Sequence, residues 1–454
     1  MPSIAILGGS VIGSATALLF ARAGWTATVV DPELPLLVHP DGAVRPRPGA
    51  PQAVQAHGHT ARATYELRTR LPDVYDALLA AGANELPFTP PPHLATHDSR
   101  TADDRLRAVR TRRVVLDAVI GDIVRREPAV TTLPVAAKGL LLEEGVVPRA
   151  TGFRLADGST VAADVLVDAG GRRSPVTRWL ADAGIAQPEE TSDCSLAYYS
   201  RHHRIVGEPP PMPGFAIVLE FPTHQLLAFR GDRDYLTVAL VRHTRDRDRA
   251  GWREDEAFDA ALASTPGFAD SWRALEPEGP VLPMGAVRNR MTELVDAGRP
   301  LVLGLHQLGD SLTTTNPSRG RGIALGLAAA GRLVDLLTAE GAPPAADEAA
   351  LSFHAWQQDV LRHYFRETCV VDLELADRIH ATLTGGEAPT TAPDLLLPDD
   401  HPVTSAQVAE AAGSDPALFR LFVSALHMMD DAHEIASAAT VAKVRQLLAE
   451  AQPS

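Results

Sequence analysis

Two residue types are scarce in this chain of 454 residues. It contains two lysines, Lys138 and Lys443, and two cysteines, Cys194 and Cys369. The cysteines are too far apart in sequence for a Cys-x-x-Cys redox pair or a zinc site, so we expect two buried, reduced thiols. Acidic residues outnumber basic ones, and the formal net charge is -15. Because binding to nucleic acid needs clustered positive charge, this balance argues against a nucleic-acid partner.

Long hydrophobic runs are also missing. No uninterrupted stretch reaches the roughly 18 apolar residues of a transmembrane helix, so none is predicted. The apolar N-terminus lacks a basic n-region and is interrupted by glycines, which is typical of a first strand and helix rather than of a targeting segment. We therefore expect a cytoplasmic protein. The hydrophobic content of 45% is that of an ordinary globular protein, and the length exceeds one typical domain.

The start of the chain has the pattern of a βαβ unit. The pattern predicts, in order, a strand, a glycine-rich turn, a helix and a second strand ending in an acidic residue: Ser3–Leu7, Gly8–Gly13, Ser14–Ala23, Thr26–Val30 and Asp31. Such units bind dinucleotides, with the acidic residue on the adenosine ribose. Ser10 stands at the second glycine of the fingerprint, and its small side chain still permits close approach of a pyrophosphate. This motif alone would fit NAD as well as FAD.

A second pattern lies far along the chain. The apolar run Leu301–Leu305 predicts a buried strand that leads to Gly309 and Asp310, and a Pro/Gly-rich turn, 316–322, then opens a helix over Ile323–Leu337. The Asp310 carboxylate can hold a polyol chain, and a helix N-terminus can face an anionic ring. A reduced flavin is such a ring. The unit resembles the second flavin-binding motif of the FAD-dependent monooxygenases, the fold family of p-hydroxybenzoate hydroxylase and squalene epoxidase.

Three further segments extend this resemblance. They are an arginine-led helix at Arg113, a strand running into Asp168-Ala169-Gly170, and a loop containing Arg47–Gln52 and His57–His59. The resemblance implies that Arg113 lies beside the FAD phosphates, although the neighbouring Arg112 is an alternative. It places Asp168 near the pyrophosphate.

Together the motifs predict one FAD site and the architecture around it. The implied cofactor-binding residues are Gly8, Ser10, Gly13, Asp31, Arg113, Asp168, Gly309, Asp310, Pro317, Gly320, Arg321 and Gly322. The predicted fold class is α/β, with a Rossmann-like FAD-binding domain, an inserted antiparallel β-sheet and a helical C-terminal region. The corresponding domain boundaries are 1–189 and 291–342 for the FAD-binding domain, 190–290 for the sheet and 343–454 for the helices.

The inserted sheet is expected to roof the flavin and form the substrate pocket. Strands are predicted over Ser195–Arg201, Phe215–Phe221, Gln225–Phe229 and Tyr235–His243, with a helix over Glu254–Ala263. Candidate pocket side chains are Tyr198, Tyr199, His202, His203, Phe229, Arg230 and Arg242, of which alternation should turn about half away from the flavin. The C-terminal helices are expected over Ala349–Leu383, Ser405–Ala412 and Pro416–Gln452, with a proline-rich linker over 385–402. The histidine pairs lack ligand-spaced partners, so no metal is predicted.

The resemblance implies an FAD-dependent monooxygenase. Such an enzyme inserts one oxygen atom from O2, by epoxidation or hydroxylation, into an apolar or aromatic small molecule, here one of secondary metabolism. Because the cofactor carries the hard step, no catalytic side chain is singled out. Electrons would come from NADPH or NADH, or as reduced flavin from a partner flavin reductase. No second G-x-G-x-x-G unit is present, so a dedicated NADPH domain is not expected.

Three alternatives remain. Flavin-dependent halogenases share the fold, but the family needs a reactive lysine and a Trp-x-Trp-x-x-Pro element. Neither Lys138 nor Lys443 lies in a matching segment, and no two of the five tryptophans stand two apart. An FAD-dependent reductase or oxidase of the same fold is the second alternative. A non-enzymatic FAD-binding protein is the third.

Overall fold

A five-stranded parallel sheet organises the larger part of the chain. The computed structural model describes residues 1–34, 47–90, 93–94, 104–212, 214–266, 269–285, 288–339, 344–386, 394, 396–398 and 400–451. The strand order is β19 (Leu305–Gln307), β9 (Val165–Asp168), β1 (Ser3–Leu7), β2 (Thr26–Val30) and β5 (Val130–Leu133). All four pairings are parallel. The βαβ unit predicted at the N-terminus is therefore present, with β1 at the centre of the sheet.

Both faces of this sheet are covered, because alternate residues of β1 point to opposite sides. Ile4 and Ile6 pack into a core with four main helices, whereas Ala5 and Leu7 pack into a second core on the other face. The first face carries α1 (Val11–Arg22), α2 (Ala61–Arg70), α5 (Arg113–Arg126) and α9 (Gly322–Leu337), with α3 (Pro72–Ala80) beside them. The second carries α6 (Val176–Asp182) and a small antiparallel sheet of β6 (Ala137–Glu143), β7 (Arg149–Leu155) and β8 (Thr160–Ala162). The predicted fold class is confirmed.

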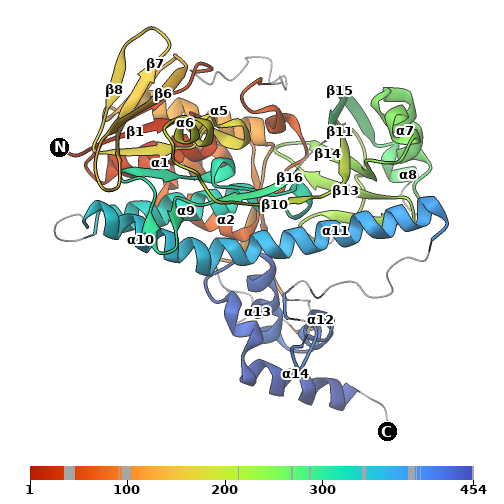
Figure 1. The fold of residues 1–454 in the computed structure, drawn as a ribbon. Coiled ribbons are helices and arrows are strands. Elements are labelled where there is room, and N and C mark those ends of the chain that lie inside the picture. Colours follow the sequence, from red (N-terminus) through yellow and green to blue (C-terminus); the bar gives the residue numbers. More distant parts are fainter. Residues whose placement is uncertain are drawn as a thin grey trace.

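A second sheet, wholly antiparallel, lies beside the first part (Figure 1). Its order is β12 (Ile217–Phe221), β13 (His224–Arg230), β14 (Tyr235–His243), β11 (Leu196–Ile205) and β15 (Leu275–Met284). One face packs on α7 (Asp255–Ala263) and α8 (Ala269–Trp272), and the opposite face packs on a long C-terminal helix. The insertion predicted from the turn pattern is present in the expected order.

Shorter strands connect the two parts. β10 (Glu189–Asp193), β16 (Arg288–Thr292) and β20 (Thr313–Thr314) form a three-stranded antiparallel sheet. Two further pairs are β3 (Asn84–Pro87) with β4 (Arg107–Arg110), and β17 (Val295–Asp296) with β18 (Arg299–Pro300). Because β10 and β16 are the strands that lead into and out of the insertion, their pairing closes its base.

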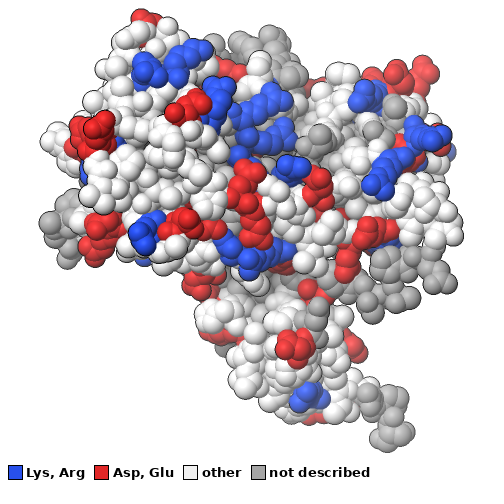
Figure 2. Space-filling view, in the orientation of Figure 1, with Lys and Arg blue, Asp and Glu red and all other residues white. Residues whose placement is uncertain are grey.

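The C-terminal region is helical. Helix α10 (Ala346–Trp356) continues through a π-helical turn (Gln357–Leu361) into α11 (Arg362–Thr384), which runs along the lower edge of both sheets in Figure 1. Below it lies a small bundle of α12 (Ser405–Ala412), α13 (Pro416–Leu426) and α14 (Ala438–Ala451) with its own core. Figure 2 shows acidic and basic side chains interspersed over this face, so the negative net charge is not gathered there in a single patch.

Three sequence-based expectations were wrong in detail. The strand expected over Leu301–Leu305 joins the sheet only at Leu305, because Gly304 has a φ of +74° and turns the chain just before it. The helix expected over Ala349–Leu383 is interrupted by the π-helical turn. The helix expected over Pro416–Gln452 is two helices, separated by a stretch in which Met428 has a φ of 60°. Gln452, and residues 387–393, 395 and 399 of the expected linker, lie outside the described residues.

One strand of the antiparallel sheet was missed. β15 contains Pro277, Pro280 and Pro283, which read as breaks in a strand pattern. Proline has no N–H to donate, so it is confined to edge strands, and β15 is an edge strand paired only with β11. Within the residues that the structure describes, no helix is both long enough and apolar enough to cross a membrane.

Candidate functional site

A cavity opens where the parallel strands end. Residues directly after β1, β2, β9 and β19 line it, namely Gly8, Asp31, Ala169 and Leu308. Ligands of open parallel sheets bind in this crevice outside the carboxyl ends of the strands.

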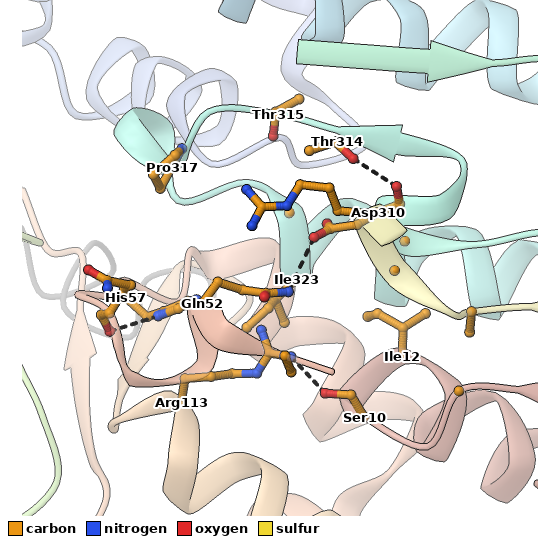
Figure 3. A pocket seen from close by; sticks show the side chains of 18 of the residues that line it. Ser10, Ile12, Gln52, His57, Arg113, Asp310, Thr314, Thr315, Pro317 and Ile323 are labelled. Carbon is orange, nitrogen blue, oxygen red and sulfur yellow. Dashed lines mark hydrogen bonds between the residues drawn. The ribbon is translucent and has the colours of Figure 1, made fainter. Parts of the chain in front are cut away.

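Ten of the twelve predicted cofactor-binding residues line this cavity, and two do not. The ten are Gly8, Ser10, Asp31, Arg113, Gly309, Asp310, Pro317, Gly320, Arg321 and Gly322. Figure 3 shows side chains from both ends of the sequence, Ser10 and Asp310 among them, converging on one space. The two distant motifs therefore form a single site.

Gly13 and Asp168 lie behind the cavity wall. A Cβ built on Gly13 would stand 1.8 Å from the carbonyl oxygen of Gly8, so only glycine lets α1 pack against the turn. The Asp168 carboxylate is fully buried and accepts hydrogen bonds from the Gly170 N–H, the Ser174 hydroxyl and the Gln307 amide at 3.0, 2.8 and 3.1 Å. Asp168 thus holds the turn that follows β9, and it is Gly170 that faces the cavity.

A hydrogen-bonded chain fixes the turn after β1. Ser10 donates to Asp117 at 2.8 Å and accepts from the Arg113 guanidinium at 2.9 Å, and Arg113 also pairs with Asp117 at 3.1 Å. Asp31 accepts from the Gly9 N–H at 2.8 Å, which ties the second strand to the glycine turn. Ser10, in place of a glycine, therefore holds Arg113 against the wall of the cavity.

The structure decides between the two adjacent arginines. Arg113 lines the cavity. Arg112 points elsewhere: it makes two buried contacts of 2.9 Å with Asp232 and stacks over Tyr235, 3.4 Å from the ring centroid. Arg112 fastens the antiparallel sheet to the larger part of the chain, and of the two adjacent arginines it is Arg113 that supplies a cation to the site.

Asp310 is the acidic side chain in the middle of the cavity (Figure 3). Burial raises the pKa of this carboxyl, while Arg113, Arg172 and Arg290 act to lower it. Its one hydrogen-bond partner among the described residues is the Gln52 amide at 3.4 Å. Gly309 supports the bend at this point with a φ of +62°. Lightly bonded and turned to empty space, Asp310 is placed to accept hydrogen bonds from a ligand.

The loop from Pro317 to Gly322 is held from behind by the C-terminal helix α11. Arg321 is buried, forms an ion pair of 2.9 Å with Glu367 and stacks over Tyr364. Asn316, just before the loop, donates to Asp372 at 2.7 Å, and Asp372 also accepts from the Asn289 amide at 2.8 Å. Sequence motifs gave no signal for Glu367 or Asp372, because their partners lie 46 and 56 residues away.

Two histidines of the loop after η1 (Pro51–Val54) are neutral. Burial, reinforced by Arg113, lowers the pKa of His57 to about 3 and that of His59 to about 4. The Nδ1 of His57 lies 3.0 Å from the Gln55 carbonyl oxygen, which can only accept, so the neutral ring carries its proton there. His57 therefore presents Nε2 as an acceptor in the cavity wall.

The seven candidate pocket residues of the sheet divide between its faces, as alternation predicts. Tyr198, His202 and Phe229 are on the face toward the cavity, and the remaining four, Tyr199, His203, Arg230 and Arg242, are on the face toward α7. His202 has no ring nitrogen left for a ligand, because one contacts the Val54 carbonyl at 2.9 Å and the other the Thr237 hydroxyl at 2.8 Å. It fastens η1 to the sheet.

A smaller pocket lies between this sheet face and the large cavity. Four residues line both spaces: Gln55, Ala56, Met284 and Pro317. The other lining residues are Tyr198, Ser200, Leu227, Phe229 and Ala239. Gln55 and Met284 were not among the predicted residues. Gln55 lies within the loop that the sequence resemblance marked, whereas Met284 belongs to the missed strand.

Among the residues that the structure describes, no three His, Cys, Asp or Glu side chains gather in a way that could hold a metal ion. Both cysteines lie apart from the cavity lining, and burial raises the pKa of Cys194 to about 12 and that of Cys369 to about 11. They are thiols rather than thiolates at neutral pH.

No protein-family model matches the chain, and no curated protein matches its sequence. Its fold is nevertheless similar to solved flavoproteins. A triple mutant of the flavin-dependent brominase Bmp2 aligns over 98% of this chain and 98% of its own, with a TM-score of 0.59 and 14% identity. PqsL of Pseudomonas aeruginosa, a probable FAD-dependent monooxygenase, aligns over 84% of this chain and 99% of its own, with a TM-score of 0.60 and 15% identity. The flavin-dependent halogenase CmlS aligns over 99% and 77%, with a TM-score of 0.60 and 16% identity.

At these identities the likeness establishes the fold. The chain has the fold shared by FAD-dependent monooxygenases and flavin-dependent halogenases, as the sequence resemblance predicted.

Proposed function

We propose that this chain binds FAD and uses it to insert one oxygen atom from O2 into an apolar or aromatic small molecule. The observation that carries the proposal is the single cavity into which the Gly8–Gly13 turn and the Asp310 loop both open. The cavity continues into an uncharged pocket against the antiparallel sheet. In this proposal residues 1–189 and 291–342 hold the cofactor, and residues 190–290 hold the substrate.

The lining fits an adenine dinucleotide with an attached polyol and ring. The glycine turn excludes side chains where a pyrophosphate would lie, and Arg113 supplies a cation there. Asp31 would meet the ribose, and Asp310 would accept from the hydroxyls of the polyol. The N-terminus of α9, at Gly322, would face the ring and stabilise negative charge by about 1 kcal/mol.

Bound FAD would supply the two-electron and oxygen chemistry, which amino-acid side chains cannot provide. The contribution of the chain is then to bind, to orient and to exclude water. The sheet pocket is walled by Leu227, Phe229 and Met284, whose apolar side chains keep solvent from the reacting atoms. In this proposal the electrons come from NADPH or NADH, or as reduced flavin from a partner flavin reductase.

Halogenation is the second candidate, because two of the similar structures are a brominase and a halogenase aligned over nearly the whole chain. Against it stands the position of the two lysines. Lys138 is exposed on β6, and Lys443 pairs with Asp415 in the C-terminal bundle at 3.1 Å. Neither lines the cavity or the sheet pocket. A reductase or oxidase of the same fold would bind FAD through the same residues. It would differ from a monooxygenase in that no oxygen atom of O2 enters the product.

Isotope labelling tests the proposed reaction. The purified protein is supplied with NADPH or NADH, or with a flavin reductase, and a turned-over substrate is identified. Under 18-O2 we expect one labelled oxygen atom in the product. A product that has gained only hydrogen, or none of the label, would overturn the monooxygenase proposal in favour of the reductase or oxidase. A halide-dependent product with no label would favour the halogenase.

A further inference from the structure

Ser10 stands at the N-cap position of α1, yet its side chain makes no capping hydrogen bond. A serine at this position ordinarily accepts from a backbone N–H of the first helical turn. Here the hydroxyl instead donates to Asp117 at 2.8 Å and accepts from the Arg113 guanidinium at 2.9 Å. The side chain of Ser10 therefore leaves the N-terminus of α1 uncapped, and an uncapped helix N-terminus favours an anion.

The same hydroxyl fixes the direction of Arg113. This side chain is 8% exposed and lines the cavity. Its Nε donates to Asp117 at 3.1 Å, and its Nη2 donates to Ser10. The two contacts orient the planar guanidinium and use two of its five N–H donors, so the others remain for a ligand.

A glycine at position 10 would remove one of these two contacts. Arg113 would then be held through Nε alone, and a long side chain that is free to change rotamer loses more entropy when it binds a ligand. The charge at the site would not change, because Asp117 still pairs with Arg113 and lies 3.8 Å from Arg47. The fold should tolerate the change, since glycine is acceptable at an N-cap. Only the orientation of the guanidinium differs.

We infer that Ser10 is a positioning residue for the phosphates of the bound cofactor, because its hydroxyl holds Arg113 beside the uncapped N-terminus of α1. The inference rests on the proposed function for the identity of the ligand as FAD, but it applies to any adenine diphosphate bound at this turn. It reverses the expectation from the G-x-G-x-x-G fingerprint, in which a second glycine gives the pyrophosphate its closest approach.

Ser10→Gly tests the inference, because it restores the fingerprint and removes the hydroxyl. Full-length protein is freed of bound flavin and titrated with FAD and with ADP, and thermal melts confirm the fold. We expect Ser10→Gly to bind both ligands about three- to tenfold more weakly than the wild type. Ser10→Thr keeps the hydroxyl and should stay close to the wild type. Equal or tighter binding by Ser10→Gly would overturn the inference.

A double-mutant cycle with Arg113→Met separates positioning from a merely structural role. Methionine removes the donors that Ser10 orients, so adding Ser10→Gly to this variant should change FAD affinity by less than about twofold. A further loss as large as in the wild-type background would show that Ser10 acts independently of Arg113, and would also overturn the inference.

The two ligands distinguish failure of this inference from failure of the proposed function. A wild type that binds ADP but not FAD, and loses ADP affinity in Ser10→Gly, would support the role of Ser10 and contradict the proposed function. A wild type that binds FAD as tightly as Ser10→Gly does would contradict the inference alone. Binding of neither ligand by the wild type would contradict both.

Discussion

Asp310 is the side chain on which the cofactor site depends most directly. It lies half-buried in the cavity and carries a raised pKa, and among the described residues its carboxylate has only the long contact with Gln52. Hydrogen bonds to charged acceptors contribute about 1.5–3 kcal/mol, so Asp310→Ala should weaken flavin binding roughly 10- to 100-fold without loss of fold. Asp310→Asn, which keeps one acceptor, should be intermediate. Fluorescence titration with FAD gives both values, and full affinity in the alanine variant would show that the polyol lies elsewhere.

Gly13 tests the other end of the site. In Gly13→Val the new side chain must displace the Gly8 carbonyl, so α1 moves away from the turn and flavin affinity falls. Gly251→Ala is the control, because a Cβ there meets nothing within 4 Å and the φ is not in the left-handed region. Flavin content and circular dichroism are compared. A Gly13→Val protein with wild-type flavin content would contradict the assignment of the pyrophosphate to this turn.

His427 predicts a pH dependence of stability. It lies between Phe88 and Phe215, and its Nδ1 accepts from the Ala61 N–H at 3.1 Å. Burial, helped by Arg321, lowers its pKa from 6.5 to about 3. Between these values the unfolded chain binds a proton that the folded chain does not. The contribution of His427 to the free energy of unfolding is therefore complete above about pH 6.5 and is lost as the pH falls through this window.

His427→Gln should lose part of this dependence, because the glutamine oxygen can still accept from Ala61 but does not titrate. Thermal melts at about pH 7.5 and about pH 5.5 should differ by about 1 kcal/mol less in the variant than in the wild type. Other buried histidines act in the same direction, so the wild-type loss is larger than this share. An unchanged pH dependence in His427→Gln would mean that His427 is protonated in the folded state.

At the residue scale, the sequence predicted those positions whose role is local. Gly8, Ser10 and Asp31 follow strands at fixed offsets, and the cavity is lined by all three. Gln55 also lines the cavity but could not be selected in this way, because its side chain is held by the Leu282 carbonyl, 227 residues away. Asp168 shows the opposite case. Its motif predicted a cofactor contact, but its carboxylate accepts hydrogen bonds within the turn behind the cavity wall.

Among the elements, α11 is the one that the motifs left without a role. Its Asp372 is fully buried and accepts hydrogen bonds from the side-chain amides of Asn289 and Asn316. It therefore joins the C-terminal region to the loop that leads to Pro317. The helix therefore does more than cover the sheets. It holds one wall of the cavity in place.

Asp372→Ala should lower stability by about 3 kcal/mol, because two buried amides lose their acceptor. Flavin affinity should fall with it, since the Asn316 loop is no longer held. Asp377→Ala, an exposed position on the same helix, is the control and should change neither quantity. Chemical denaturation and FAD titration are the measurements. If stability falls and flavin affinity does not, α11 supports the fold without positioning the site.

Sequence periodicity predicted elements best where the backbone is regular. Strands β1 and β2 and helix α12 have the predicted bounds. It failed where a tertiary contact overrides the pattern. The prolines of β15 are tolerated only because the strand is at an edge, and the break after α13 is set by packing of His427 on the rest of the chain.

At the scale of the whole molecule, the fold brings together two halves of one site that lie far apart in the sequence. β1 and β19 are separated by nearly 300 residues, yet β9 pairs with both and sets their ends side by side. The antiparallel sheet and α11 then close the space from the other side. We therefore expect the purified protein to hold a cofactor in this cavity unless the cofactor is lost during purification.

Identification of the bound cofactor tests this central claim most directly. The protein is purified, its visible absorption spectrum is recorded, and the cofactor released by heat is separated by chromatography. Protein obtained without colour is first reconstituted with FAD, FMN and NAD in parallel. The account predicts FAD, with a flavin spectrum and about one molecule per chain. Release of FMN or NAD, or reconstitution by either in preference to FAD, would contradict it.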